Sequence, residues 1–397
     1  MAPAGESVSV QAAEAPYVLL VESQPDRELE RAWLFDAPRS VLCCREPHEV
    51  EHCLALADDA VRAGHYVAGF LAYEAGYGLQ PKLSSLAARA PEEHLVWLGI
   101  FDQRQELRGA ALEQFFAERG AGEGAELSKL RFDTNEAEYA ADFARIQQHL
   151  LDGDSYQVCH SFRCHFELSG SPAALFERLR RRQVTAFSAL ISTGDYSILS
   201  LSPELFFRKT GTHIELKPMK GTSRRGRDAE EDAMLTEQLR QDKKILAENV
   251  MIVDLLRNDI GRLARVGSVR APELFSVERY ETVLQMTSTV VAEVESSLGL
   301  LPLMQSLFPC GSVTGAPKLR SMQIIHALEE SPRGIFCGSI GYVAPNHDAC
   351  FNVAIRSLLL SREGKGTLGV GGGVVVDSTS KGELEECLLK AEFLTCA

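Results

Sequence analysis

The chain has 397 residues, of which 45% are hydrophobic and 24% are charged, a composition typical of soluble globular proteins. Its formal charge of −14 disfavours nucleic acid as a partner, because phosphate backbones attract basic surfaces. The sequence shows neither an apolar run long enough to span a membrane nor a secretory signal, so we expect a cytoplasmic protein.

Strand-like and helix-like segments alternate along the chain and predict an α+β fold. Residues 16 to about 110 combine strand-like runs with a helix over 47–64, and residues 120–128, rich in Gly, Ala and Glu, are the best linker candidate. A helix then begins at the capping pattern of Asn135 and Glu138 and ends at Gly153. Strands dominate to about Pro218. Residues 228–258 are helical, residues 335–376 are strand-rich, and a last helix starts at about 381. This order predicts two packed, mainly antiparallel sheets with helices outside.

The ten cysteines are scattered without a C-x-x-C pattern, which indicates reduced core residues rather than a disulfide framework. The nearest approach to a metal cluster is Cys159-His160 with Cys164-His165. Strand alternation would put Cys159 and Cys164 on opposite faces, so the spacing disfavours zinc.

Two helices carry carboxylates at positions that need an explanation. In the helix over 243–258, Glu248 falls within the apolar arc, where it is either a paired carboxylate at the margin or a candidate metal ligand. In the last helix, Glu383, Glu386 and Lys390 share one stripe. They form either an exposed salt-bridge stripe or a site in which the acids hold Mg²⁺ and Lys390 binds an anion.

Three further segments allow both a structural and a chemical interpretation. Residues 369–373 are rich in glycine and either kink a strand or expose main-chain N–H groups to an anion. Residues 311–318 are only superficially similar to a phosphate loop, because Pro317 and Lys318 stand where that motif needs Gly-Lys-Ser/Thr, which disfavours ATP. Lys220, between Pro218 and Gly221, is either a loop residue or, if desolvated, a nucleophile.

Taken together, several segments resemble the chorismate-utilising enzymes. The match runs in order from about 134 to 395, and residues 16–120 resemble the synthase large subunits of that family more loosely. The resemblance implies one catalytic domain over 16–397, a large α/β sandwich around two sheets, after a flexible N-terminus of residues 1–15. The matching segments are Ser202-Pro203-Glu204, residues 218–222, 247–259 and 308–318, and the glycine-rich end with Glu383 and Glu386.

Three positions indicate which reaction the resemblance implies. Gln157 stands where members that add water carry a lysine, so isochorismate or salicylate formation is disfavoured. Lys220 stands where anthranilate synthases typically have alanine and aminodeoxychorismate synthase large subunits have lysine. Gln285 replaces a histidine of the anthranilate synthases and is poorly suited to removing the ring proton for aromatisation. The implied reaction, of the transaminase class, converts chorismate and ammonia to 4-amino-4-deoxychorismate for 4-aminobenzoate and folate synthesis. An anthranilate synthase component and a non-catalytic chorismate-binding subunit are the alternatives.

The resemblance also implies roles for individual residues. Glu204 donates a proton to the departing C4 hydroxyl of chorismate, Lys220 attacks C2, and ammonia adds at C4 and expels the lysine. Mg²⁺ lies between Glu248 and Glu386, with Glu383 in support. The residues expected to bind substrate are Thr222, Arg356, Gly371, Lys390 and Gln157.

The source of ammonia is expected to be another chain. None of the ten cysteines lies in a Gly-x-Cys-x-Gly nucleophile elbow, so we expect a separate glutamine amidotransferase subunit, and the short segment after the last helix leaves no room for a fused lyase. Residues 19–23, ending at Glu22 and Ser23, loosely resemble a tryptophan-lining segment of relatives but carry an inserted residue. A plain edge strand is the alternative.

Overall fold

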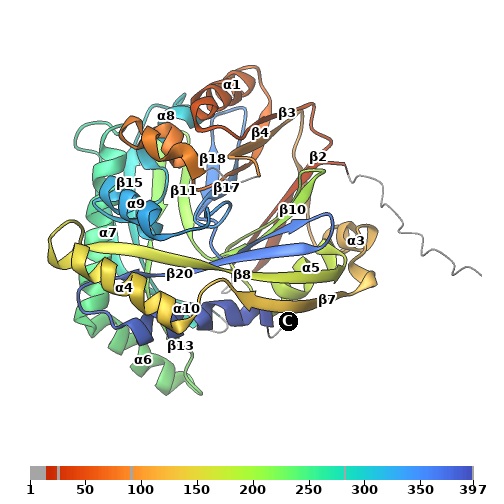
Figure 1. The fold of residues 1–397 in the computed structure, drawn as a ribbon. Helices are drawn as coiled ribbons and strands as arrows, with labels where there is room; N and C mark the ends of the chain where they lie inside the picture. The colour runs from red at the N-terminus through yellow and green to blue at the C-terminus, as the bar shows by residue number, and fades with distance from the viewer. Residues whose placement is uncertain (1–14, 25–26, 90–92, 281–282, 396–397) are drawn as a thin grey trace, which may run out of the picture.

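The computed structural model describes residues 15–24, 27–89, 93–280 and 283–395, and in these ranges two antiparallel sheets pack face to face (Figure 1). The expected flexible N-terminus of residues 1–15 therefore lies, except for Ala15, outside the described residues. Along the first sheet the strand order is β16 (Gly315–Ala316), β8 (Gln157–Gly170), β20 (Lys365–Val374), β19 (Ser357–Ser361), β10 (Tyr196–Ser202), β9 (Phe187–Ser192), β1 (Tyr17–Gln24), β2 (Arg27–Asp36) and β6 (Gln105–Leu107), with β7 (Ala125–Phe132) beside β8.

The second sheet is built in the same way and, like the first, contains strands from the N-terminal third and from the rest of the chain. This mixing makes each part of the chain depend on the other for its sheet pairing. The strand order is β13 (Met219–Arg224), β15 (Val283–Glu293), β12 (His213–Lys217), β11 (Leu205–Thr210), β18 (Ala349–Asn352), β17 (Ser339–Val343), β4 (Tyr66–Leu71), β5 (Val96–Phe101) and β3 (Ser40–Cys44), with β14 (Arg270–Arg279) beside β15.

Helices cover the outer faces of both sheets, so that the hydrophobic core is divided into layers. Between the sheets lies a cluster that includes Val18, Phe70 and Ile198. Over the first sheet lie α3 (Ala110–Glu118), α4 (Glu136–Leu151), α5 (Pro172–Arg182) and α10 (Ser380–Thr395). Over the second lie α1 (Val50–Arg62), α2 (Ala75–Leu79), α7 (Lys243–Gly261) and α8 (Leu300–Leu307), with α6 (Ala229–Gln241) packed near β13 and β14. α9 (Lys318–Leu328) contributes side chains to both outer clusters. The predicted α+β sandwich is confirmed.

Local capping signals place several helices where the sequence predicts them. The side chain of Asn135 accepts hydrogen bonds from the main chain of the first turn of α4, and Glu138 completes a capping box. Asp228 and Asp242 cap α6 and α7 in the same manner. These caps satisfy N–H groups that have no partner within the helix, which is why the boundaries are readable from sequence.

One sequence-based expectation about local structure is wrong. Residues 120–128 are not a linker, because Ala121–Glu123 form a 3-10 turn between Gly120 and Gly124, both at φ +80°, and β7 begins at Ala125 and pairs with β8. Strands dominate up to Pro218 as expected, although this region also contains α5, whose first turn is capped by the Ser171 side chain with Pro172 at its start. The glycines of residues 369–373 lie inside β20, where Gly371 is opposite Ser161 of β8.

The expected alternative of a plain edge strand near Glu22 is also wrong, since β1 is paired on one side with β2 and on the other with β9. No helix in the described part of the chain has both the length and the apolar composition required to cross a membrane.

Candidate active site

Glu204 and Lys220 both form a hydrogen bond to the same residue, Ser312. Glu204 lies between β10 and β11 and is 3% exposed, while Lys220 is the second residue of β13. The Ser312 hydroxyl donates to Oε1 of Glu204 at 2.6 Å, and Nζ of Lys220 donates to the main-chain oxygen of Ser312 at 3.1 Å. The structure thus brings together the two residues predicted to carry the chemistry.

The carboxyl group of Glu204 has the protonation behaviour that a proton donor needs. Burial raises the pKa of Glu204 to about 7, against the opposing effects of the hydrogen bond from Ser312 and the charge of Lys220. A carboxyl group with this pKa is substantially protonated near neutral pH, whereas an exposed glutamate is not. Glu204 is therefore suited to general acid catalysis.

The segment that carries Lys220 is held by two amide side chains. Asn249 of α7 donates to the main-chain oxygen of Lys220 at 3.1 Å, and Nε2 of Gln285 donates to the main-chain oxygen of Gly221 at 2.9 Å. Gly221 has φ +88°, and a Cβ there would lie 2.4 Å from a methyl carbon of Ile245, so this position requires glycine.

Gln285 also accepts a hydrogen bond at 2.8 Å from the hydroxyl of Thr222, one of the expected substrate-binding residues. By sequence alone, Gln285 signals only that a base is absent at this position. Its contacts show that it supports the strand carrying the amine, a role that no sequence pattern signalled.

The three carboxylates predicted for a metal site gather between α7 and α10. Nζ of Lys244 lies 4.0 Å from Oε1 of Glu248 and 3.7 Å from Oε1 of Glu383, so one ammonium group links the two helices. Glu383 also accepts from the hydroxyl of Ser378 at 2.6 Å, and Glu386 pairs with Lys390 at 2.8 Å. Burial raises the pKa of Glu248, and the nearby acids reinforce that effect. Although burial opposes it, the charge of Lys390 lowers the pKa of Glu386.

These residues provide a donor set that consists of oxygen atoms, which Mg²⁺ prefers. Within the described ranges, no three His, Cys, Asp or Glu side chains are arranged closely enough to hold a metal between them. Mg²⁺ does not require three, since it usually binds one or two carboxylates and completes its shell with water and ligand oxygens. Glu248 and Glu386 fit such a pair, while the hydrogen bond from Ser378 fixes Glu383 beside them.

Two cationic side chains, Arg356 and Lys390, are predicted to bind the anionic groups of a ligand. Arg356, between β18 and β19, has φ +51°, and burial lowers the pKa of its guanidinium. Among the carboxylates that the structure describes, none pairs with Arg356, so its bidentate donor face suits an anionic ligand. Lys390 donates to the main-chain oxygen of Gly371 at 3.0 Å in addition to its pairing with Glu386.

Glycines in β20 allow side chains to lie directly against the strand backbone. A Cβ at Gly372 would lie 3.1 Å from Oε2 of Glu383, and one at Gly373 would lie 3.0 Å from Nε2 of Gln157. Gln157 is fully buried, and its Oε1 has no hydrogen-bond partner among the described residues. An unpaired buried amide oxygen beside glycines is a group that a ligand can satisfy.

A cavity of about 280 Å³ is lined by Pro203 and Met219, the chain neighbours of Glu204 and Lys220. Its lining also includes Glu22, Arg208 and Lys217. Oε1 of Glu22 accepts from Arg208 at 3.4 Å, and its Oε2 accepts from Arg31 at 2.8 Å. The cavity thus reaches Glu22 of β1.

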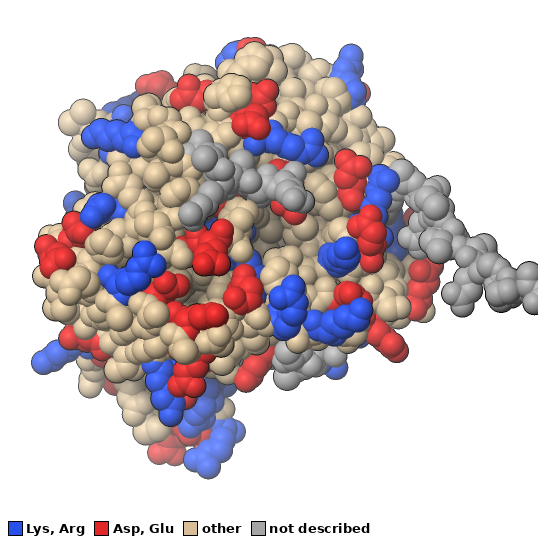
Figure 2. All heavy atoms as spheres, in the orientation of Figure 1, with Lys and Arg blue, Asp and Glu red and all other residues tan. Residues whose placement is uncertain are grey.

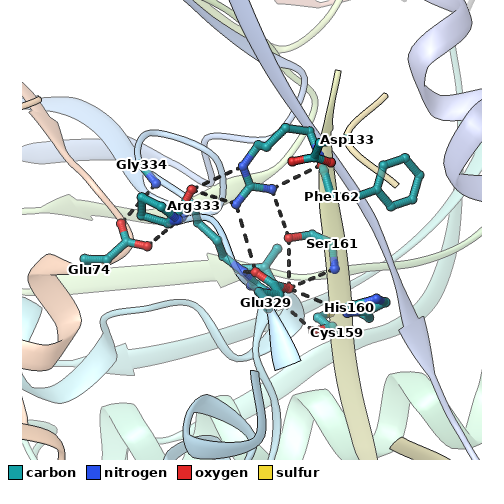
Figure 3. Close-up of polar contacts among 12 residues, drawn as sticks. Glu74, Asp133, Cys159, His160, Ser161, Phe162, Glu329, Arg333 and Gly334 are labelled. Carbon is teal, nitrogen blue, oxygen red and sulfur yellow. Dashed lines mark hydrogen bonds and ion pairs between the residues drawn. The ribbon is translucent and has the colours of Figure 1, made fainter. Parts of the chain in front are cut away.

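A buried ion network lies beside the glycine-rich strand (Figure 3). Arg333 donates to Glu329 at 2.7 and 2.9 Å, and Glu329 also accepts from the main-chain N–H and the hydroxyl of Ser161 at 2.8 and 2.9 Å. Glu74 accepts from the main-chain N–H groups of Arg333 and Gly334 at 2.6 and 3.0 Å, and burial raises its pKa to about 7. The network joins α9, β8 and the segment after β4.

On the face drawn in Figure 2, acidic and basic side chains are interspersed around a hollow. The net charge of −14 therefore says little about the local potential at the site, where Lys220, Lys244 and Lys390 lie close to carboxylates.

The chain is similar to known proteins over most of its length. The model of a family described as chorismate binding enzyme matches residues 16–395. Solved structures with a similar fold include an isochorismate synthase, DhbC, from Bacillus anthracis, with a TM-score of 0.75, 19% identity and coverage of 96% of this chain and 95% of that one. Anthranilate synthase component I from Streptococcus pneumoniae has a TM-score of 0.74 and 21% identity over 98% and 94% of the two chains.

Curated relatives are more similar in sequence. Aminodeoxychorismate synthase component 1 from Bacillus subtilis is 40% identical over 62% of this chain and 52% of its own, and its namesake from Salmonella typhimurium is 42% identical over 63% and 55%. Anthranilate synthase component 1 from Cereibacter sphaeroides is 37% identical over 70% of this chain and 55% of its own. The matches thus span about half the length of these relatives. Because the family model covers nearly the whole sequence and the fold agrees, the chain belongs to the chorismate binding enzyme family.

Proposed function

We propose that this chain aminates chorismate at C4 with ammonia and releases 4-amino-4-deoxychorismate, a transaminase-class reaction. The observation that carries the proposal is the buried carboxyl of Glu204, with a pKa of about 7, joined through Ser312 to the amine of Lys220. Relatives named aminodeoxychorismate synthase component 1, at 40 and 42% identity, support this choice of product.

The first half of the proposed reaction removes the C4 hydroxyl. Glu204 transfers its proton to that hydroxyl, which leaves as water, while the unprotonated amine of Lys220 forms a bond to C2. Both ring double bonds shift, from C1–C2 to C1–C6 and from C5–C6 to C4–C5, as the C4–O bond breaks. In the second half, ammonia bonds to C4, both double bonds shift back, and the bond between C2 and Nζ breaks. Glu204 then regains a proton, and Lys220 is free for another turnover.

The proposed binding mode uses the positive groups of the site for the two carboxylates of the substrate. Arg356 and Lys390 supply charge-assisted hydrogen bonds, and the backbone at Gly371 lies close enough for direct contact because it has no side chain. Thr222 and Gln157 bind neutral parts of the substrate. The amide of Gln157 cannot deprotonate water. Its presence therefore favours ammonia over water as the nucleophile that completes the reaction.

Glu248 and Glu386 are the proposed ligands of Mg²⁺, with Glu383 beside them. When bound, the ion would neutralise a substrate carboxylate and thereby favour departure of the hydroxyl. Without it, three carboxylates in one region would repel a dianionic substrate.

Ammonia is proposed to come from a separate glutamine amidotransferase subunit. The support is the designation "component 1" of the relatives, which implies a further component. We place the reaction in the cytoplasm, in the synthesis of 4-aminobenzoate and folate.

The test is to incubate the purified chain with chorismate, MgCl₂ and ammonium chloride, without any partner. The expected product is a non-aromatic amine that an added aminodeoxychorismate lyase converts to 4-aminobenzoate. The 37% identity to an anthranilate synthase component makes anthranilate the competing product. Fluorescent anthranilate formed without a lyase would overturn the proposal, and the absence of any turnover would favour a non-catalytic chorismate-binding subunit.

A further inference from the structure

Ser312 connects the two groups to which the proposed function assigns the chemistry. It lies in a short 3-10 turn, Gly311–Val313, and is 4% exposed. Its hydroxyl is 2.6 Å from Oε1 of Glu204, and its main-chain oxygen is 3.1 Å from Nζ of Lys220. One residue of a third element therefore contacts both groups, although Glu204 lies between β10 and β11 and Lys220 lies in β13.

A serine hydroxyl suits this position chemically, because it is both a donor and an acceptor. It donates to the carboxylate form of Glu204 and can rotate to accept from the protonated form. The main-chain oxygen of Ser312 only accepts, and it holds the amine of Lys220 through one of that amine's hydrogens. The contacts thus survive a proton transfer from Glu204.

The turn that carries Ser312 is itself fixed from three sides. Arg333 donates to the main-chain oxygens of Val313 and Cys159, each at 2.9 Å, and is held in turn by Glu329. The hydroxyl of Thr314 donates to the main-chain oxygen of Cys310 at 3.1 Å. A Cβ at Gly311 would lie 2.4 Å from Cδ2 of Leu255, so the turn also packs closely against α7. The buried network of Figure 3 is thus one anchor of this turn.

We propose that Ser312 is a positioning residue, whose hydroxyl orients the carboxyl of Glu204 while its main-chain oxygen orients the amine of Lys220. This inference rests on the proposed function for its catalytic meaning. The geometric part, control of Glu204 by the hydroxyl, can be measured without turnover.

The groups that face the Glu204 carboxyl come from two elements. They are the amine of Lys220 and the main-chain N–H of Met219 from β13, and the hydroxyl of Ser312 and thiol of Cys310 from the turn. The hydrogen bond from Ser312 lowers the pKa of Glu204 and so opposes burial. Removing the hydroxyl should raise that pKa by about one pH unit, the size expected for one hydrogen bond to a charged group.

The experiment compares the parent with Ser312→Ala and with a control, Ser306→Ala. Ser306 is also buried, and its hydroxyl donates to the main-chain oxygen of Asp259 rather than to Glu204. Infrared spectra are recorded from acid to alkaline pH, and the carbonyl band of protonated Glu204 is identified as the one missing in Glu204→Gln. We expect its midpoint to move upward by about one pH unit in Ser312→Ala and to stay in place in Ser306→Ala. An unchanged midpoint in Ser312→Ala overturns the inference.

The second readout is kcat/KM for chorismate with ammonium, expressed as the ratio of variant to parent at each pH, because the ratio cancels the ionisation of ammonium. Ser312→Ala is expected to have a lower kcat/KM than the parent. The ratio of variant to parent should nevertheless increase above pH 7, because Glu204 has the lower pKa in the parent and loses its proton there at lower pH than in the variant. A flat ratio, with an active parent, overturns the catalytic role of Ser312 even if the infrared midpoint moves. If the parent forms no product, the proposed function fails, and the infrared titration still decides whether Ser312 controls Glu204.

Discussion

Lys318 and Asp259 form a buried ion pair, with Nζ of Lys318 at 2.6 Å from Oδ2 of Asp259. Lys318 also donates to the main-chain oxygen of Leu307 at 2.7 Å. The pair connects Lys318, the first residue of α9, to the C-terminal part of α7. In the sequence, the turn that contains Ser312 lies between Asp259 and Lys318. A lysine engaged in this way stabilises the fold, which agrees with the expectation that residues 311–318 are not an ATP loop.

Replacing this lysine should destabilise the protein strongly. Lys318→Met would leave the carboxylate of Asp259 buried without its cation, and we expect the free energy of unfolding to fall by about 3 kcal/mol. Urea denaturation followed by circular dichroism measures the change, and Lys381→Met, on the exposed surface of α10, is the control. Adding Asp259→Leu to Lys318→Met should recover part of the loss. A double variant no more stable than the single one would contradict the assignment of the loss to an unpaired charge.

Lys220→Met tests the proposed nucleophile. We expect formation of 4-amino-4-deoxychorismate to fall by at least about a hundredfold, because no other amine replaces the one that bonds to C2. Chorismate affinity, measured by calorimetry, should change much less. Lys217→Met is a matched control, since its amine pairs with Glu278 of β14. Amination that persists at the parent rate in Lys220→Met would remove covalent catalysis from the mechanism.

Glu204→Gln should stabilise the protein in a pH-dependent manner. The pKa of Glu204 is raised from 4.5 to about 7 by burial, so the folded state binds a proton that the unfolded state releases in this interval. The parent therefore loses stability as pH rises through this window, by up to about 3 kcal/mol, and a neutral glutamine does not. Urea unfolding at about pH 5 and pH 8 should show the gain of Glu204→Gln over the parent at the higher pH.

Glu74 titrates in the same window in both proteins and cancels from that comparison. A difference in unfolding free energy between Glu204→Gln and the parent that does not vary with pH would mean that the pKa of Glu204 is not raised in the folded protein. The same variant should lose activity by about 10²- to 10⁴-fold, the usual effect of losing a general acid.

Glu248→Gln tests the Mg²⁺ site. We expect the Mg²⁺ concentration for half-maximal activity to rise at least about tenfold, because an amide oxygen carries no charge to bind the ion. Calorimetric titration with MgCl₂ alone gives an independent readout. Glu385→Gln is the control on α10, where the carboxylate is exposed and lies 3.8 Å from Lys381. Unchanged Mg²⁺ affinity in Glu248→Gln would show that the ion binds elsewhere.

The sequence-based expectations that the structure overturns have a common physical cause. Residues 120–128 resemble a linker because they are rich in Gly, Ala and Glu. Residues 125–128, however, begin β7, which pairs with β8 through its main chain and needs little from its side chains. A plain edge strand is an alternative for residues 19–23 by sequence, but β1 has partners on both sides, β2 close by in the sequence and β9 far away. Strand pairing between distant segments is not encoded in any local window.

The sequence by itself determined the family, the fold class, the capped helices and the residue types of the site, because caps, periodicity and motifs act over a few neighbouring residues. Only the tertiary structure decided that Glu204 and Lys220 share Ser312, that Gln285 supports the Lys220 strand, and that Lys244 links Glu248 to Glu383. These relations join residues far apart in the chain. They also depend on burial, which sets the pKa of Glu204 and exists only after the two sheets and their helices have packed together.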